Sequence, residues 1–100
     1  MMLAYITCPS QDEAEKIAGQ LIEAKLIACA NLFPMESIYR WEGDIQNEQE
    51  YVLIAKTSGE KFGELKKRVK KIHPYDVPAI LKIPVEGEKE YVDWLQGELG

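Results

Sequence analysis

The chain has 100 residues and a formal net charge of −5, with 46% hydrophobic and 29% charged residues. This length accommodates one domain with one modest core, and the even spread of charge argues against disorder. The negative charge makes nucleic acid an unfavourable partner, and no apolar run reaches the roughly 20 residues that span a bilayer. Because the N-terminus also lacks the basic region of a secretory signal, we expect one cytoplasmic domain, residues 1–100, with neither nucleic acid nor membrane as a partner.

The first predicted elements are a short strand and an amphipathic helix. Leu3–Cys8 is rich in strand-forming residues and is stopped by Pro9, which lacks the N–H that a sheet ladder requires. Ser10 and Glu13 then stand at capping-box spacing, and apolar side chains follow at intervals of three and four residues. The helix is therefore predicted to begin directly after Ser10 and to bury one face.

A long hairpin is predicted in the middle of the chain. Ala28–Trp41 is a β-prone segment that contains Pro34, which indicates a bulge or an edge position. Glu42–Asp44 supplies a turn, and Ile45–Thr57 returns with apolar groups on both of its faces. Each arm thus has more residues than an ordinary strand.

The last third of the chain predicts a helix, a strand and a second helix. Glu60–Ile72 gathers lysines toward its C-terminal end, where they complement the helix dipole, and His73-Pro74 ends it. Ala79–Val85 is the last strand, and the final helix carries Tyr91 and Trp94 on its apolar stripe. The order β-α-β-β-α-β plus a helix predicts an α+β fold of the ferredoxin-like, split-βαβ type, with two helices on one face of an antiparallel sheet.

The hairpin is too long for one domain. At roughly 3.3 Å per residue, each arm of about 13 residues is about 43 Å long, whereas a compact domain of this size is about 33 Å wide. Its far end carries Ile38, Tyr39, Trp41 and Ile45, and an aromatic patch on an unpaired strand edge favours association with another copy. The alternative is that one arm bends at Pro34 and folds back over its own helices.

Several activities known on this topology are excluded by the residues. An RNA-binding module needs basic and aromatic groups on its central strands, and a copper chaperone needs two thiols in the loop Thr7–Gln11, which has one. An acyl-phosphate hydrolase needs an arginine beside a phosphate loop, but Arg40 and Arg68 lie elsewhere. Since His73 also lacks an evident nucleophile, we expect no enzyme activity and no organic cofactor.

Five stretches of sequence together resemble the CutA family of divalent-cation tolerance proteins. They are Ala28–Asn31, Ser37–Gly43, Lys56-Thr57, His73–Ile80 and Tyr91–Leu95. The resemblance implies a ferredoxin-like subunit of a tight cytoplasmic homotrimer, in which long hairpins build sheets between subunits. It also implies a role in tolerance of copper and other divalent cations, some members of the family being copper(II) binders. A likeness to trimeric PII signalling proteins gives the alternative, a sensor of small anions or nucleotides in clefts between subunits.

Candidate metal ligands are few when the resemblance is carried over by position. Ile6 and Ile72 occupy two positions where copper-binding members have ligands, so that His73 is the remaining candidate for copper(II) or another divalent cation. Cys8 lies two residues after Ile6, on the same strand face, and is a substitute candidate. The alternatives are that His73 caps the helix and that Cys8 and Cys29 are small buried groups with free thiols.

Four further residues are candidates for a cleft or an interface. Tyr39 and Trp41 line a ligand pocket or, alternatively, anchor contacts between subunits, where these residue types are enriched. Lys56 and Tyr75 hold an anion between subunits or, alternatively, are a solvated charge and a packed aromatic. The leading hypothesis is a trimeric divalent-metal tolerance protein that is not an enzyme, and the second is a PII-like sensor.

Overall fold

Seven helices and strands follow one another in the predicted order in the computed structural model, which describes residues 1–100. Their bounds are β1 Met2–Cys8, α1 Gln11–Glu23, β2 Cys29–Trp41, β3 Asp44–Thr57, α2 Gly59–Ile72, β4 Ile80–Pro84 and α3 Lys89–Leu99. All seven elements were predicted, and β4 is one residue shorter at each end than the sequence suggests.

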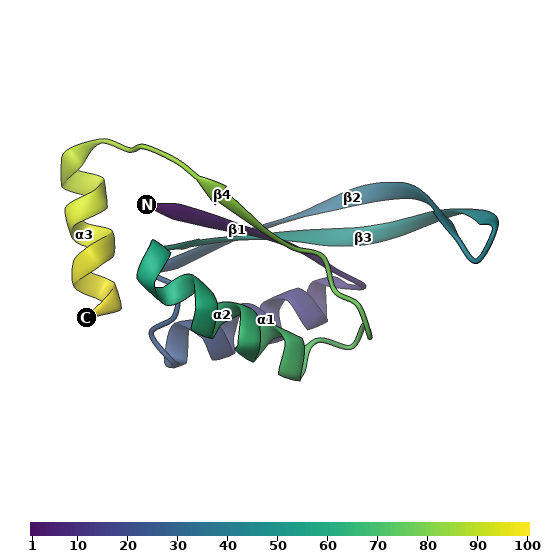
Figure 1. The fold of residues 1–100 in the computed structure, drawn as a ribbon, viewed down its shortest axis with the longest axis horizontal. Helices are drawn as coiled ribbons and strands as arrows, with labels where there is room; N and C mark the ends of the chain where they lie inside the picture. The colour runs from purple at the N-terminus through teal and green to yellow at the C-terminus, as the bar shows by residue number, and fades with distance from the viewer.

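The four strands form one antiparallel sheet in the order β2-β3-β1-β4. Helices α1 and α2 lie on one face of this sheet, whereas α3 stands across one end of it (Figure 1). The α+β, ferredoxin-like arrangement predicted from the order of elements is therefore confirmed.

The core lies between the sheet and the helices α1 and α2. Alternate residues of β1, namely Ala4, Ile6 and Cys8, are fully buried and belong to the same cluster as Ile17 and Leu21 of α1. Side chains of a strand alternate between two faces, so the residues between them point to the other side of the sheet. We call that side the open face. Large apolar side chains on it are Tyr5, Phe33, Leu81 and Ile83, of which the last three are exposed.

Side-chain caps define where the first two helices begin. The Ser10 hydroxyl oxygen accepts a hydrogen bond from the Glu13 N–H at 3.2 Å, as the sequence predicts for α1. Ser58 caps α2 in the same way, through the Lys61 N–H at 3.3 Å. Ser10 follows β1 after one residue and Ser58 follows β3 directly, so that each helix begins almost as soon as the preceding strand has ended.

The hairpin of β2 and β3 is paired without interruption from Cys29, opposite Lys56, to Trp41, opposite Asp44. Pro34 pairs in register with Tyr51, so there is no bulge. Its position is instead an edge position, because β2 is the outermost strand of the sheet and an edge tolerates a missing donor. The predicted turn is formed by Glu42 and Gly43, whose φ angles are +50° and +86°, as a two-residue hairpin turn requires.

The far half of the hairpin projects from the domain. The molecule measures 45 × 25 × 21 Å, and Figure 1 shows the hairpin extending along the longest axis, past α1 and α2 and away from α3. Strand β1 accompanies β3 only as far as Tyr51. Residues 44–50 of β3 therefore have β2 on one side and no strand on the other, which confirms the overlong hairpin and rules out an arm folded back at Pro34.

Candidate functional site

The end of the hairpin is rich in exposed apolar groups. Trp41 is 56% exposed, and Ile38, Tyr39 and Ile45 are exposed as well. By strand alternation Tyr39 and Trp41 continue the open face, whereas Ile38 and Ile45 point to the opposite side. The candidate interface residues Tyr39 and Trp41 thus lie on one surface, where both remain partly open to solvent.

His73 follows the last residue of α2 and is only 8% exposed. Its backbone N–H donates to the Val69 carbonyl, but its ring does not bond to the helix. Instead, Nδ1 accepts a hydrogen bond from the Tyr75 N–H at 3.0 Å, and Nε2 lies 2.8 Å from the Thr7 carbonyl oxygen. Since a backbone N–H can only donate and a carbonyl can only accept, the ring is neutral and carries its proton on Nε2. His73 therefore holds the loop after α2 to the end of β1.

A metal ligand needs a free lone pair, and this geometry leaves none on His73. The single lone pair of the neutral ring, at Nδ1, is occupied by the Tyr75 N–H. No three His, Cys, Asp or Glu side chains of the chain lie close enough together to hold a metal ion. The residues that one subunit brings together do not fit a copper site centred on His73.

Cys8, the substitute ligand, is fully buried at the end of β1. Burial, followed by the charges of Glu13 and Glu50, raises the pKa of the Cys8 thiol from 9.0 to about 11. The thiolate needed for metal binding is thereby disfavoured. Cys29 is also a free cysteine, but it is half-buried rather than buried, because it begins the edge strand β2.

The raised pKa of Cys8 predicts a loss of stability at alkaline pH. Because the folded-state pKa is higher than the unfolded value, the protonated thiol stabilises the fold fully below about pH 9, and this contribution disappears as the pH rises through about 11. We expect the midpoint of urea unfolding to decrease as the pH is raised from 8 to 11. In Cys8→Ala the midpoint should start lower and fall less steeply, and parallel declines in the two proteins would contradict the assignment.

Tyr75 joins the same loop to the base of the hairpin. Its hydroxyl donates to Oε2 of Glu50 at 2.7 Å, and Glu50 is only 7% exposed. Burial, followed by the bond to Glu50, raises the pKa of Tyr75 well above its usual range, so that the hydroxyl remains a donor. The hydroxyl proposed to hold an anion is thus committed to a carboxylate of its own chain.

Lys56 lies near the C-terminal end of β3, beside α3. Its Nζ donates to the Tyr91 hydroxyl at 3.1 Å and lies 5.3 Å from the centre of the Tyr91 ring, and the bond to Tyr91 raises the pKa of Lys56. Six residues separate Lys56 from Glu50, or about 20 Å along a strand. Tyr75, which is bonded to Glu50, is therefore too far from Lys56 to form an anion site with it within one chain.

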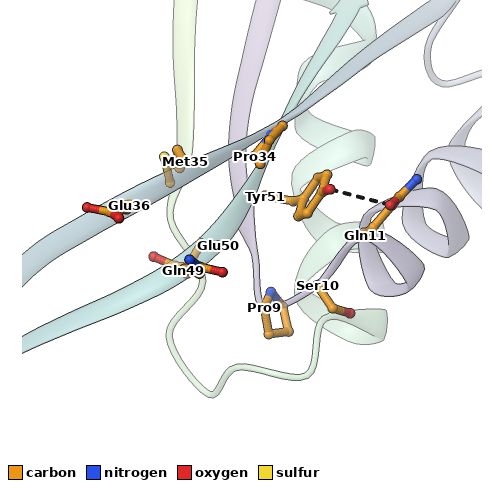
Figure 2. Close-up of a pocket in the computed structure, with 9 residues that line it drawn as sticks. All are labelled: Pro9, Ser10, Gln11, Pro34, Met35, Glu36, Gln49, Glu50 and Tyr51. Atoms are coloured by element: carbon orange, nitrogen blue, oxygen red, sulfur yellow. Dashed lines mark hydrogen bonds between the residues drawn. The ribbon is translucent and has the colours of Figure 1, made fainter.

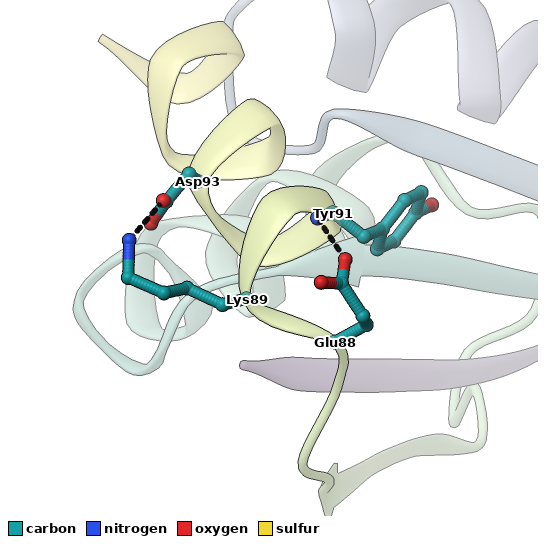
Figure 3. A network of polar contacts seen from close by, with 4 residues as sticks. All are labelled: Glu88, Lys89, Tyr91 and Asp93. Atoms are coloured by element: carbon teal, nitrogen blue, oxygen red, sulfur yellow. Dashed lines mark hydrogen bonds and ion pairs between the residues drawn. The ribbon is translucent and has the colours of Figure 1, made fainter.

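The first turn of α3 holds Tyr91 in place. Glu88 caps the helix by accepting the Tyr91 N–H at 3.1 Å, and Lys89 pairs with Asp93 at 2.7 Å (Figure 3). Trp94, 46% exposed, lies with its ring 5.6 Å from that of Tyr91. The two rings and Lys56 form an aromatic surface with one positive charge.

A pocket of about 390 Å³ lies where the hairpin leaves the domain, beneath β2 and β3 and beside the start of α1 (Figure 2). Its walls are Pro9, Ser10, Gln11, Pro34, Met35, Glu36, Gln49, Glu50 and Tyr51. The Tyr51 hydroxyl donates to Gln11 at 3.3 Å across the pocket. Glu36 and Glu50 supply negative charge and no basic side chain is present, so the pocket is unsuited to an anion.

The sequence did not indicate the roles of two residues, Glu50 beside Tyr75 and Tyr91 beside Lys56. The role of Glu50 could have been inferred from the sequence, because it lies on the same face of β3 as Val52 and Ile54. A carboxylate among apolar side chains is unfavourable unless it is paired. The contact of Tyr91 with Lys56 has no local signal, since the two residues are 35 positions apart. It depends on where α3 docks.

The fold and the surfaces described here define a class of ferredoxin-like proteins with an extended β2–β3 hairpin. The family model for the CutA1 divalent ion tolerance protein matches residues 2–98. This chain therefore belongs to the CutA family, as the sequence motifs predict.

Known relatives agree in sequence and in structure. The Archaeoglobus fulgidus "Divalent-cation tolerance protein CutA" is 50% identical over 92 residues, which cover 91% of this chain and 90% of the relative. A solved structure of the "Periplasmic divalent cation tolerance protein CutA" from that organism has a TM-score of 0.97 at 45% identity, with both chains fully covered. The "PII-like protein CutA" from Nostoc sp. PCC 7120, in apo form, has a TM-score of 0.93 at 36% identity and covers 100% of this chain and 98% of its own.

No helix of the chain is long and apolar enough to cross a membrane.

Proposed function

We propose that this chain acts as a cytoplasmic homotrimer in the tolerance of divalent cations, and that it binds a cation between subunits and catalyses no reaction. The observation that supports this most directly is the open face, whose exposed apolar groups continue onto the projecting hairpin. An exposed apolar surface next to unpaired strand edges is typical of an interface with another copy. Copper(II) is the first candidate cation, because of the names of the relatives and the copper binding that the family resemblance implies.

The site is placed between subunits because one subunit offers no suitable donor set. The ring of His73 and the thiol of Cys8 are both engaged or protonated, as described above. What the hairpin does present is negative charge, with five carboxylates between residues 36 and 50 and one base, Arg40. Carboxylates of adjacent copies would supply oxygen ligands, which suit manganese and magnesium at least as well as copper. We therefore expect a modest affinity for copper(II).

Calorimetric titration of the metal-free protein with copper(II), zinc and manganese tests the proposal. We expect at most one cation per subunit, and at least a tenfold weaker affinity in a variant that no longer assembles, such as Trp41→Ala. The matched control is Ile22→Ala, which removes another exposed apolar side chain, from α1. Absence of binding to the assembled protein, or equal affinity in the dissociated variant, would contradict an intersubunit cation site.

The second candidate, a PII-like sensor of small anions or nucleotides, is supported by the likeness to the Nostoc structure. Its binding residues would have to come from two subunits, since Lys56 and Tyr75 lie far apart within one. A nucleotide panel in the same titration separates the two functions. Micromolar binding of a nucleotide together with no cation binding would favour the sensor.

A further inference from the structure

Helix α2 carries positive charge in a chain that is negative as a whole. It has six basic and two acidic residues, so its net charge of +4 leaves −9 for the rest of a chain whose net charge is −5. The second half of the helix, residues 65–72, contains no acidic residue. We call the four exposed lysines of this half, Lys66, Lys67, Lys70 and Lys71, the lysine face. This local charge is opposite in sign to the net charge of the chain.

The lysine face lies on the side of α2 that is turned away from α1. A spacing of four residues places its members in two neighbouring rows along the helix. Arg68 belongs to the other side, because it lines a pocket whose other residues, two glutamates among them, belong to α1 or follow it directly. A further lysine, Lys82 of the edge strand β4, has its Nζ 5.4 Å from the centre of the Phe62 ring, about one turn before Lys66. Positive charge from two elements is thus gathered on this side.

The helix itself does not need all of these charges. Lysines complement the negative end of a helix dipole, but the effect is confined to about the last turn, which includes Lys70 and Lys71 and not Lys66 or Lys67. Of the four, only Lys67 forms an ion pair, with Glu64 at 3.8 Å. The other three have no acidic partner within the chain, and like charges at this spacing repel one another. An anionic surface next to the helix would relieve this repulsion.

The chemistry of the lysine face favours lipid headgroups over a protein or a nucleic acid. Protein interfaces are anchored by apolar and aromatic side chains, and none of the exposed large apolar residues of the chain lies on α2. The same absence disfavours single-stranded nucleic acid, whose bases stack on aromatic rings. A long duplex would extend past α2 to the surfaces that carry the negative charge of the chain. A cluster of about four to eight lysines or arginines is, in contrast, typical of contact with anionic lipids.

We propose that the lysine face docks on a membrane surface that contains anionic phospholipid headgroups. The apolar side of α2 is buried in the core through Phe62, Leu65 and Val69, so the helix lies on the headgroups and inserts no side chain among the acyl chains. The contact is therefore electrostatic, reversible and sensitive to salt. We expected no membrane partner from the net charge and from the lack of a spanning segment, but neither property concerns a local patch. The contact requires neither the trimer nor the cation site of the proposed function.

Co-sedimentation with vesicles tests the proposal. Vesicles of phosphatidylcholine with about 40% phosphatidylserine are compared with vesicles of phosphatidylcholine alone, at neutral pH and about 50 mM NaCl. We expect at least fivefold more protein on the anionic vesicles, and a fall to the level of the neutral vesicles at about 0.5 M NaCl, where exposed charges are screened. Equal binding to both kinds of vesicle, or binding to neither, overturns the proposal.

Matched double substitutions locate the contact. Lys67→Gln with Lys71→Gln removes two charges of the lysine face and should lower the partition coefficient on anionic vesicles at least fivefold. Lys16→Gln with Lys25→Gln removes two charges from exposed positions in α1 and just after it, and should lower the coefficient less than twofold. Circular dichroism verifies that both variants keep their helices. Equal losses would show that net charge, and not the lysine face, determines binding, and this would overturn the proposal.

Other polyanions test the choice of a membrane as the partner. Duplex DNA or an acidic peptide is added to vesicle-bound protein at the same concentration of anionic groups as the vesicles provide. We expect each to displace less than half of the protein. If either displaces most of it, a nucleic acid or an acidic protein is the better partner, and the assignment of the lysine face to a membrane is wrong.

Discussion

Replacing Trp41 with alanine should dissociate the proposed trimer at low micromolar concentration. In a single subunit this side chain is 56% exposed, next to the turn of a hairpin that has no neighbouring strand on its outer edges. Truncating a central aromatic of an interface costs about 2 kcal/mol or more, and in a threefold ring the loss occurs at three contacts. The assembly should therefore weaken by several orders of magnitude.

Sedimentation velocity and thermal unfolding are the measurements for this prediction. Wild type should sediment with three times the 11.4 kDa subunit mass, and Trp41→Ala should sediment as a smaller species with a lower unfolding temperature. Ile22→Ala, which also removes an exposed apolar side chain, is the control and should remain assembled. If Trp41→Ala keeps both the mass and the melting temperature of wild type, the hairpin end lies outside the interface.

The fold could be predicted because its signals are local. Pro9 and Ser10 separate the first strand from the first helix, and the alternation along β3 identifies a strand with both faces buried in part. The length of the hairpin, counted in residues, was enough to infer that it projects from the domain. These signals depend only on neighbouring residues and on the number of residues in a segment. Most predicted ends of helices and strands therefore lie within one or two residues of the observed ends.

The site could be predicted only in part because its contacts are distant in sequence. That His73 ends a helix is a local property, but its bond to Thr7 joins residues 66 positions apart. The end of a helix does not reveal which strand the following loop will contact. For the same reason the sequence suggested that Lys56 and Tyr75 hold one anion together, whereas Tyr75 contacts Glu50, six residues along β3 from Lys56.

Two side-chain hydrogen bonds join the loop after α2 to the ends of β1 and of the paired part of β3. Residues 73–75 contact β1 through His73 and β3 through the hydroxyl of Tyr75, at the point where β1 ends and the hairpin continues alone. Strand β4 pairs with β1 only as far as Ile6. Beyond this residue the loop, and not β4, lies beside the end of β1. Its bonds to Thr7 and Glu50 tie the start of the projecting hairpin to the rest of the domain.

His73→Ala should lower the free energy of unfolding by about 2–4 kcal/mol. The substitution removes the donor to the Thr7 carbonyl and the acceptor of the Tyr75 N–H, each worth about 1 kcal/mol, and it also removes a ring that is 8% exposed. Urea unfolding of the protein at neutral pH measures the loss. His73→Asn should lose less than His73→Ala, because its side-chain amide oxygen can still accept the hydrogen bond from the Tyr75 N–H.

Copper(II) affinity in His73→Ala decides between the two roles of this residue. The family resemblance makes His73 the first candidate ligand, but its lone pair at Nδ1 is already occupied by the Tyr75 N–H. Copper could bind there only if the ring left both of its partners, and the metal would then have to replace their stabilisation. We therefore expect the copper affinity of the assembled protein to change less than twofold in His73→Ala while its stability falls. A tenfold loss of affinity in a variant that remains assembled would show that the ring does turn to the metal, and that the bonds seen here belong to the metal-free state.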